Sequence, residues 1–413
     1  MFKLEAVFAF EGDCLLLHYG PEDPHPNWLL IDGGARGTWR GFLEKRLLQL
    51  AEDWDLDGPV PLQMVMVSHV DADHVTGVLD LFKHLRDDRA PEKVCRVAQL
   101  WHNSFDDVIG NDDQELVSKL VAPPPGGSGA DPDTAAVVAS VAQGRQLRLD
   151  AEALGMATNH PFTGLVLAQK GPAVAIPVTP AAAGLTFRVL APDIPRVREY
   201  QEKWNAFLRE KGLAEVEAAA FKDQSAFNLA SLVVLAEHGG RKVLLTGDAR
   251  GDFVVNGLAA AGLLDADAAF PERREGQSAA AFKAAQEAAE DREVTPFHVD
   301  LLKVPHHGSD RNVTVGFFRR VPADHYVISA NGKHHNPDPP TLRMIAEARG
   351  EEDEYTIHFT FTEDQHETET NEEFAEALAQ VHEWVTDERP DNCTVVYREP
   401  GEDVYSVTVD LSE

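Results

Sequence analysis

The strongest chemical signal in the sequence lies in residues 69–74, which read HVDADH. This run places His69, Asp71, Asp73 and His74 directly after an apolar stretch that predicts a buried strand. Burying these groups together without a partner would be costly, whereas imidazole and carboxylate are donors that zinc, manganese and iron accept. We therefore interpret the run as part of a metal site, the alternative being a polar turn that holds these residue types by chance.

Three further groups of polar residues follow apolar runs that also predict buried strands. The run LLTGD opens through a glycine onto Asp248, a position from which one carboxylate could bridge two cations. KVPHHGS places His306 and His307 side by side, and ISANGKHHNP by itself would be a loop with exposed histidines. Because α/β sheets place their sites at the carboxyl ends of strands, we expect these groups to meet.

The elements that must position these residues are short strands and amphipathic helices, which together predict a layered α/β sandwich in a single domain, residues 1–413. Residues 105–225, with a Pro- and Gly-rich stretch at 121–135, are expected to be an insertion or lid. The β-α-β-β pattern of residues 346–413 would either complete the sandwich or form an appended module. Strands are expected at residues 3–10, 14–19, 28–32, 62–67, 94–100, 229–237, 242–246, 300–304, 326–330, 355–361, 393–398 and 404–410. Helices are expected at residues 38–53, 75–88, 134–156, 199–221, 252–293, 340–350 and 371–385.

The composition narrows the classes of partner. Acidic residues outnumber basic ones 69 to 37, giving a formal charge of −32, which argues against a broad basic surface for duplex DNA. Nucleic acid at one local groove stays possible, because bound cations can supply positive charge there. The three cysteines form no C-x-x-C pair and fit a reducing cytoplasm, and acidic residues interrupt the apolar N-terminal stretch, so we expect no signal peptide and no membrane span.

The order of the motifs H-x-D-x-D-H, LLTGD, KVPHHGS and ISANG followed by H-x-P resembles the metallo-β-lactamase superfamily. It is most similar to the soluble metallohydrolase domain of ComEC-type DNA-uptake proteins and the stand-alone relatives of that domain. EGDCLLL and LIDGG near the N-terminus, together with Asn228 and Ser231, fit the same branch. The resemblance covers roughly residues 1–85 and 225–345, and it implies a four-layer αβ/βα sandwich with an inserted helical or loop region.

The resemblance also implies a site for two divalent metal ions, zinc or manganese. Asp71 stands where the superfamily's common motif has a second histidine, and this harder oxygen donor shifts the preference from zinc toward manganese or magnesium. Asp248 would lie between the two ions. The expected ligands are His69 and Asp71 for the first ion, Asp73 and His74 for the second, with Asp248, His306 or His307, and His102 as an additional mid-chain ligand.

Such a centre would supply a metal-bound hydroxide as nucleophile and would stabilise charge on the substrate oxygens. Asp71 or Asp73 could orient the hydroxide proton, and His335 would act near the leaving group as a general acid or phosphate ligand. The candidate substrate-binding residues are Ser309, Asn331 and Lys333, the last of which could equally be a solvated surface cation.

The favoured function is therefore a phosphodiesterase or nuclease acting on nucleic acid or nucleotides. One alternative is hydrolysis of a carboxylic ester, lactone or amide, since fold alone does not choose a substrate. Another is a metal-stabilised component of a defence or signalling system that depends on a protein partner. The complete ligand set argues against the last, because a purely structural site needs no open water position.

Overall fold

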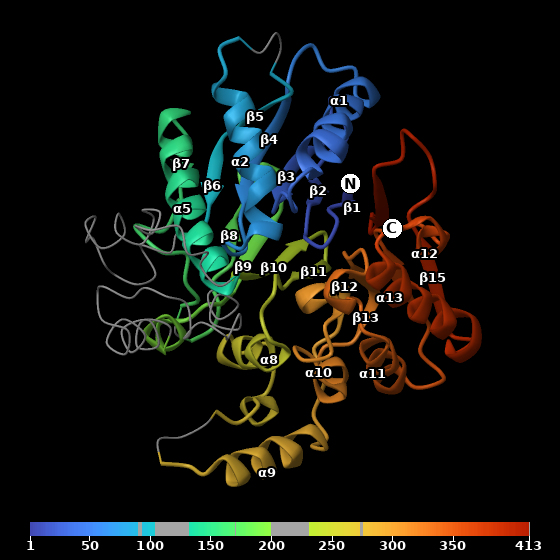
Figure 1. Ribbon diagram of the computed structural model, residues 1–413. Coiled ribbons are helices and arrows are strands. Elements are labelled where there is room, and N and C mark those ends of the chain that lie inside the picture. Colours follow the sequence, from blue (N-terminus) through green and yellow to red (C-terminus); the bar gives the residue numbers. More distant parts are fainter. Residues whose placement is uncertain (90–92, 104–131, 170, 200–230, 273–275, 413) are drawn as a thin grey trace, which may run out of the picture.

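The computed structural model describes residues 1–89, 93–103, 132–169, 171–199, 231–272 and 276–412. All but the first residue of the expected helix at residues 199–221, and all of residues 105–131, lie outside this description. The described chain forms two mixed sheets of eight strands each, with helices on both outer faces (Figure 1). The predicted α/β sandwich of four layers is thereby confirmed.

The first sheet has the strand order β16-β1-β2-β3-β4-β6-β7, with β5 also paired to β4. The N-terminal strands are antiparallel, whereas β3, β4 and β6 run parallel. Its strands are β1 (Phe2–Val7), β2 (Leu15–Tyr19), β3 (Asn27–Ile31), β4 (Val60–Met66), β5 (Cys95–Val97), β6 (Gln99–Trp101), β7 (Ala157–Thr158) and β16 (Ser406–Asp410).

The second sheet has the order β15-β14-β13-β12-β11-β10-β9-β8, and the strands from β11 to β15 are all parallel. The antiparallel hairpin of β10 and β11 turns at Gly239 and Gly240, whose positive φ angles of 58° and 87° suit glycine. Its strands are β8 (Ile176–Pro177), β9 (Thr186–Ala191), β10 (Val233–His238), β11 (Arg241–Leu245), β12 (Val299–Lys303), β13 (Ala323–Ile328), β14 (Tyr355–Phe359) and β15 (Cys393–Tyr397).

Side chains alternate between the two faces of each strand and thereby contribute to three apolar layers. In β3, Leu29 and Ile31 point into the core between the sheets, whereas Trp28 and Leu30 point to the outer helical layer. Both faces of such a strand are buried, which explains why its sequence reads as a continuous apolar run. The outer face of the first sheet is covered by α1 (Glu44–Asp53), α2 (Ala72–Arg86) and α5 (Pro132–Ala153). The outer face of the second is covered by α8 (Gly251–Ala260), α10 (Val315–Arg320), α11 (Pro339–Arg349) and α13 (Glu372–Glu383) (Figure 1).

Several expected elements differ in detail from those observed. The expected helix at 252–293 is two helices, α8 and α9 (Ala279–Glu290), because Gly262 adopts a φ of 72° and ends the first. The expected strand at 94–100 divides at Ala98 into β5 and β6. The described part of residues 105–225 contributes β7, β8 and β9 at the ends of the two sheets, three strands that we did not predict.

The C-terminal segment completes the sandwich. Strands β14 and β15 extend the second sheet, and β16 pairs with β1 in the first, with Lys3 opposite Asp410. The small helix α12 (Gln365–Thr368) and α13 lie between β14 and β15 in the chain. Of the two expectations for residues 346–413, the structure therefore fits completion of both sheets.

A buried polar group joins the first three strands to α1. Glu5 on β1 accepts a hydrogen bond from His18 Nε2 at 2.9 Å and pairs with the guanidinium of Arg46. Trp28 Nε1 donates to His18 Nδ1 at 3.0 Å, and an indole nitrogen can only donate. His18 therefore carries its hydrogen on Nε2, which fixes its ring between Trp28 and Glu5.

Replacing Glu5 with Gln should lower the free energy of unfolding by about 3 kcal/mol near pH 7, because it removes the anion of a buried ion pair. Burial opposes ionisation, but His18 and Arg46 lower the pKa of Glu5 from 4.5 to about 2. The stabilisation is thus present above about pH 4.5 and is lost as the pH falls toward about 2. Urea unfolding near pH 7 and about pH 3 measures it, with exposed Glu351→Gln as the control. Equal stability of the two variants near pH 7 would contradict the role of Glu5.

Candidate metal centre

The candidate centre forms where strands of both sheets end. Residues 69–74 run from the turn after β4 into the first turn of α2, and Asp248 lies just after β11. His306 and His307 occupy a short helical turn after β12, which is the parallel neighbour of β11. The parallel order brings the carboxyl ends of β11 and β12 to one edge, as the sequence predicted.

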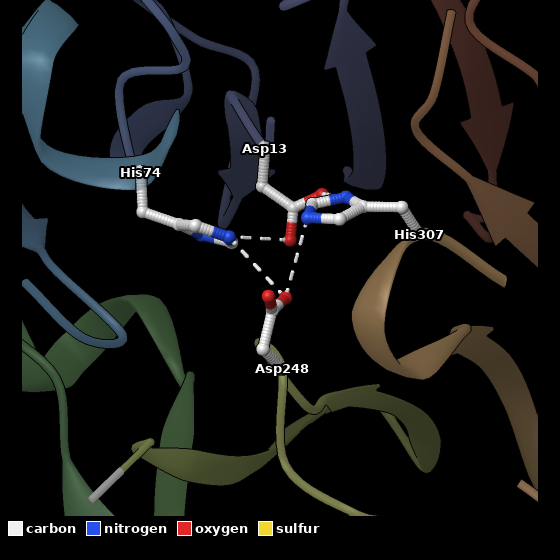
Figure 2. Close-up of side chains that lie close together, drawn as sticks. All are labelled: Asp13, His74, Asp248 and His307. Carbon is white, nitrogen blue, oxygen red and sulfur yellow. Dashed lines mark ion pairs between the residues drawn. The ribbon is translucent and has the colours of Figure 1, made fainter. Parts of the chain in front are cut away.

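A buried cluster of Asp13, His74, Asp248 and His307 has potential ligand atoms that all lie within 4.8 Å of one another, so it could hold a metal ion (Figure 2). Within it, Asp248 Oδ1 is 3.2 Å from His74 Nε2 and 3.4 Å from His307 Nε2. Asp73 Oδ2 approaches the same face, at 3.6 Å from His307 Nε2. One oxygen of Asp248 therefore faces two histidines and lies near a second carboxylate.

The other oxygen of Asp248 faces a second pair of histidines. Asp248 Oδ2 is 3.8 Å from His69 Nε2 and 3.7 Å from His306 Nε2. Asp71 Oδ2 lies 3.4 Å from His69 Nε2. The sequence left open whether His306 or His307 approaches Asp248; both do, on different oxygens.

Each of three histidines is oriented by a contact at its Nδ1 atom. His74 Nδ1 donates to Asp32 Oδ2 at 2.9 Å, and His307 Nδ1 donates to the carbonyl oxygen of Ser329 at 3.0 Å. Ser68 Oγ donates its hydrogen to Asp32 Oδ2, so it accepts from His69 Nδ1 at 3.0 Å. With Nδ1 protonated in all three rings, the lone pair of a neutral imidazole lies on Nε2, toward Asp248.

The nitrogen and oxygen atoms that face the inside of the centre are suited to bind a cation. Within the described ranges, the buried Nε2 atoms of His69, His74 and His307 and the Oδ1 atom of Asp248 have no hydrogen-bond partner. Buried polar atoms are ordinarily satisfied, and leaving several unsatisfied in one place is costly. A cation among them would remove that cost.

Asp13 and Lys303 stand behind the histidines and were missed as site residues by the sequence analysis. The ammonium of buried Lys303 pairs with the Asp13 carboxylate, donates to the carbonyl oxygen of Gly247 at 3.2 Å and lies 4.0 Å from Asp248 Oδ1. Asp13 lies on the Nδ1 side of the rings, 3.4 Å from His307 Nδ1 and 3.9 Å from His74 Nδ1. Because Asp248 faces the Nε2 atoms instead, we regard Asp13 as a group that orients the histidines and neutralises Lys303.

Electrostatics in the cluster favour a bound cation. Burial opposes ionisation of Asp248, but the neighbouring His307, His306 and His74 hold its pKa well below the ordinary value. Burial likewise opposes protonation of His74 and His307, but Asp248 and other carboxylates raise the pKa of both rings well above 6.5. Without a metal ion these histidines therefore hold protons, and a metal ion would have to displace them, so metal affinity falls as the pH falls.

Unusual backbone geometry accompanies the centre. His306 and His307 have φ angles of 48° and 56°, in the left-handed region that few non-glycine residues adopt. Such strain persists only where the surroundings enforce it, and His306 N is held by the carbonyl oxygen of Gly247 at 3.2 Å. A Cβ atom on Gly12 would lie 1.7 Å from the carbonyl oxygen of Asp73, so only glycine lets the β1–β2 loop approach the motif.

The remaining expected site residues lie in different surroundings. His102 directly follows β6, and its backbone pairs with the side chain of Asn159. It is not among the four histidines that form ion pairs with Asp248 in the described part of the chain. His335 is on the surface, with a 62% exposed side chain and its Nε2 atom 3.5 Å from Glu373 Oε1. Its roles and that of His102 stay predictions.

The expected substrate-binding residues Ser309, Asn331 and Lys333 lie in the loops after β12 and β13. Ser309 and Asn331 are buried, and Asn331 Oδ1 accepts from the backbone nitrogen of Lys333 at 3.2 Å. Lys333 Nζ pairs with Glu11 Oε1 at 2.5 Å. This cation is thus neutralised and would have to leave Glu11 to meet a phosphate.

Comparisons with known proteins add no assignment: no protein-family model matches the chain, and a search of curated proteins finds no match.

Within the described residues, no helix is both long enough and apolar enough to cross a membrane. Cys14, Cys95 and Cys393 are free and buried.

Metal binding should depend on Asp248 and, through His74, on Asp32. Asp248→Ala should abolish binding, whereas Asp32→Asn should weaken Mn²⁺ or Zn²⁺ affinity about 10- to 100-fold, because it removes the charge that orients the His74 ring. Titration calorimetry and elemental analysis of the dialysed protein measure both effects. The surface variant His298→Ala should bind as the wild type does. Undiminished metal content in Asp248→Ala would show that the cluster does not hold the ion.

Proposed function

We propose that the protein is a metal-dependent hydrolase with a centre for two divalent cations, zinc or manganese. The observation that carries the proposal is the Asp248 carboxylate, whose two oxygens face separate pairs of histidines. In the proposed assignment, one ion is held by Asp73, His74 and His307, and the other by His69, Asp71 and His306, with Asp248 between them.

Uneven exposure supports a catalytic rather than a structural site. The side chains of Asp248 and His307 are 4% and 3% exposed, whereas those of Asp71, Asp73 and His306 are 25%, 28% and 24% exposed. One side of the centre is thus sealed in protein and the other meets solvent. A structural metal site is closed, while a catalytic one keeps a position open to water or substrate.

The proposed chemistry divides between the cations and the protein. Divalent cations at these ligands would lower the pKa of water toward neutrality and neutralise charge that develops on a substrate oxygen. Asp71 and Asp73, as the partly exposed carboxylates, would orient the attacking water and accept its proton. Asp32, Ser68 and the Ser329 carbonyl group would keep the histidine rings fixed, so little reorganisation accompanies the reaction.

Among substrates, we propose phosphodiesters, as found in nucleotides or short single-stranded nucleic acid. Carboxylate-rich ligand sets suit manganese or magnesium, which commonly act on phosphate oxygens. The order of the four motifs, which resembles that of ComEC-type metallohydrolases of the metallo-β-lactamase superfamily, supports the same substrate class. The formal charge of −32 disfavours long duplex DNA as substrate.

Hydrolysis of bis(p-nitrophenyl) phosphate, beside p-nitrophenyl acetate, tests this function in the presence of manganese or zinc. Phosphodiester turnover should require the metal and should fall by about 100-fold or more in the double variant Asp73→Ala with His74→Ala. His298→Ala again serves as the matched histidine control. Turnover of the acetate alone would replace the proposal with carboxylic ester hydrolysis, and turnover that survives chelation would exclude a metal-dependent reaction.

His335 provides a separate test of phosphodiester chemistry. If it protonates the leaving group, His335→Ala should lower kcat by about 100-fold while metal content stays unchanged. The loss should be smaller for a p-nitrophenolate leaving group, which needs little protonation, than for an alkoxide leaving group. A uniform loss for both leaving groups, or an unchanged kcat, would contradict this role.

A further inference from the structure

A cavity of about 830 Å³ lies beside the candidate centre, between the loop at residues 161–169, the end of β9 and helix α8. This volume falls within the range that small-molecule sites usually have. Its lining includes Phe162, Ala168, Ser231, Ala249 and Phe253.

The cavity adjoins the loops that carry the candidate ligands. Ala249, which lines it, directly follows Asp248 in the chain. Ser231 lines it as well, and the backbone nitrogen of the next residue, Leu232, donates to the carbonyl oxygen of Ser68 at 2.8 Å. Ser68 in turn contacts the Nδ1 atom of His69. A molecule in the cavity would therefore lie next to the histidine and carboxylate cluster.

The loop at residues 161–169 is held in place by two buried asparagines. The Asn159 side chain accepts from the backbone nitrogen of His102 at 2.9 Å and donates to the carbonyl oxygens of His102 and Gly164. The Asn103 side chain pairs with both the N–H and the carbonyl group of Val166, at 2.8 and 3.0 Å. The segment 102–103 thus acts as the anchor of the cavity wall, which is preformed rather than assembled on binding.

The chemistry of the wall selects an uncharged ligand. Leucine, alanine, proline and phenylalanine side chains dominate the lining. Among the lining residues that the structure describes, the cation is Arg196 and the anions are Asp193 and Glu272. Arg196 pairs with Glu272 at 2.5 Å and packs its guanidinium 3.8 Å from the centre of the Phe253 ring. The described wall therefore offers no excess positive charge to a phosphate.

We propose that this cavity binds an uncharged, apolar group of the substrate, adjacent to the bond that is cleaved. The proposal rests on the hydrolase function proposed above. Aromatic and aliphatic groups share this chemistry, and the substrate series below distinguishes them.

Direct binding tests the cavity without any catalysis. The neutral fluorophore N-phenyl-1-naphthylamine should bind the full chain saturably, and Ala168→Phe, which fills the cavity, should weaken binding about tenfold. Thr163→Trp, at an exposed point of the lining, should also weaken fluorophore binding. This second variant keeps the test valid if Ala168→Phe fails to fold. Ala284→Phe, on the exposed side of α9, is the matched control and should bind as the wild type does. Equal affinity of the wild type and both cavity variants would overturn the proposal.

Turnover of p-nitrophenyl phosphodiesters with a methyl, phenyl or octyl ester group separates this proposal from the function on which it rests. The phenyl or octyl diester should exceed the methyl diester in kcat/KM by about tenfold, with the advantage lost in Ala168→Phe mainly through KM. The preferred member shows whether the group is aromatic or aliphatic. Equal kcat/KM across the series would overturn the cavity proposal alone. Saturable fluorophore binding without turnover of any diester would overturn the phosphodiesterase function and leave the cavity's preference for apolar ligands standing.

Discussion

The burial of carboxylates and imidazoles in one place is the constraint on which the rest of the structure depends. Such groups are costly away from water unless each finds a partner, and the chain supplies partners from both sheets. Asp32 and Ser68 come from the first sheet's loops, while Lys303 and the Ser329 carbonyl group come from the second. His306 and His307 adopt the left-handed backbone conformation, which is energetically unfavourable for residues other than glycine. This conformation turns the two adjacent rings toward different oxygens of Asp248.

The outer contacts and the inner atoms of the centre have opposite characters. On the outside, every Nδ1 contact described above is with a defined acceptor, which makes the rings rigid. On the inside, the Nε2 atoms and Asp248 Oδ1 lack hydrogen bonds within the described residues. Next to this polar region lies an apolar cavity whose cation is already paired. Under the proposed function, a charged cluster beside an apolar cavity suits a substrate with one charged and one uncharged end.

The sequence indicated the local motifs because their candidate ligands are neighbours in the chain, as in residues 69–74. It also predicted the strands that feed them, since a strand buried on both faces leaves an uninterrupted apolar run. Asp13, Asp32 and Lys303 escaped prediction as site residues because their partners lie far away in sequence: the ion pair of Lys303 with Asp13 spans 290 positions, as the difference between the two residue numbers gives. Strand β9 was missed although Thr186–Ala191 (TFRVLA) has strand-forming residues, because the glycine- and proline-rich surroundings favoured an irregular insertion.

The pairing of β1 with β16 has a consequence for how the chain folds as it is made. Lys3 and Asp410 lie opposite each other, so one edge of β1 stays without its native neighbour until residues 406–410 have been synthesised. An open strand edge invites pairing with other chains, and long-range closure of this kind is slow. Glu5 sits in the middle of that edge with its carboxylate turned inward toward His18 and Arg46. A foreign strand that paired with β1 in place of β16 would cover this charge without offering the hydroxyl that Ser406 gives it, which disfavours such pairing.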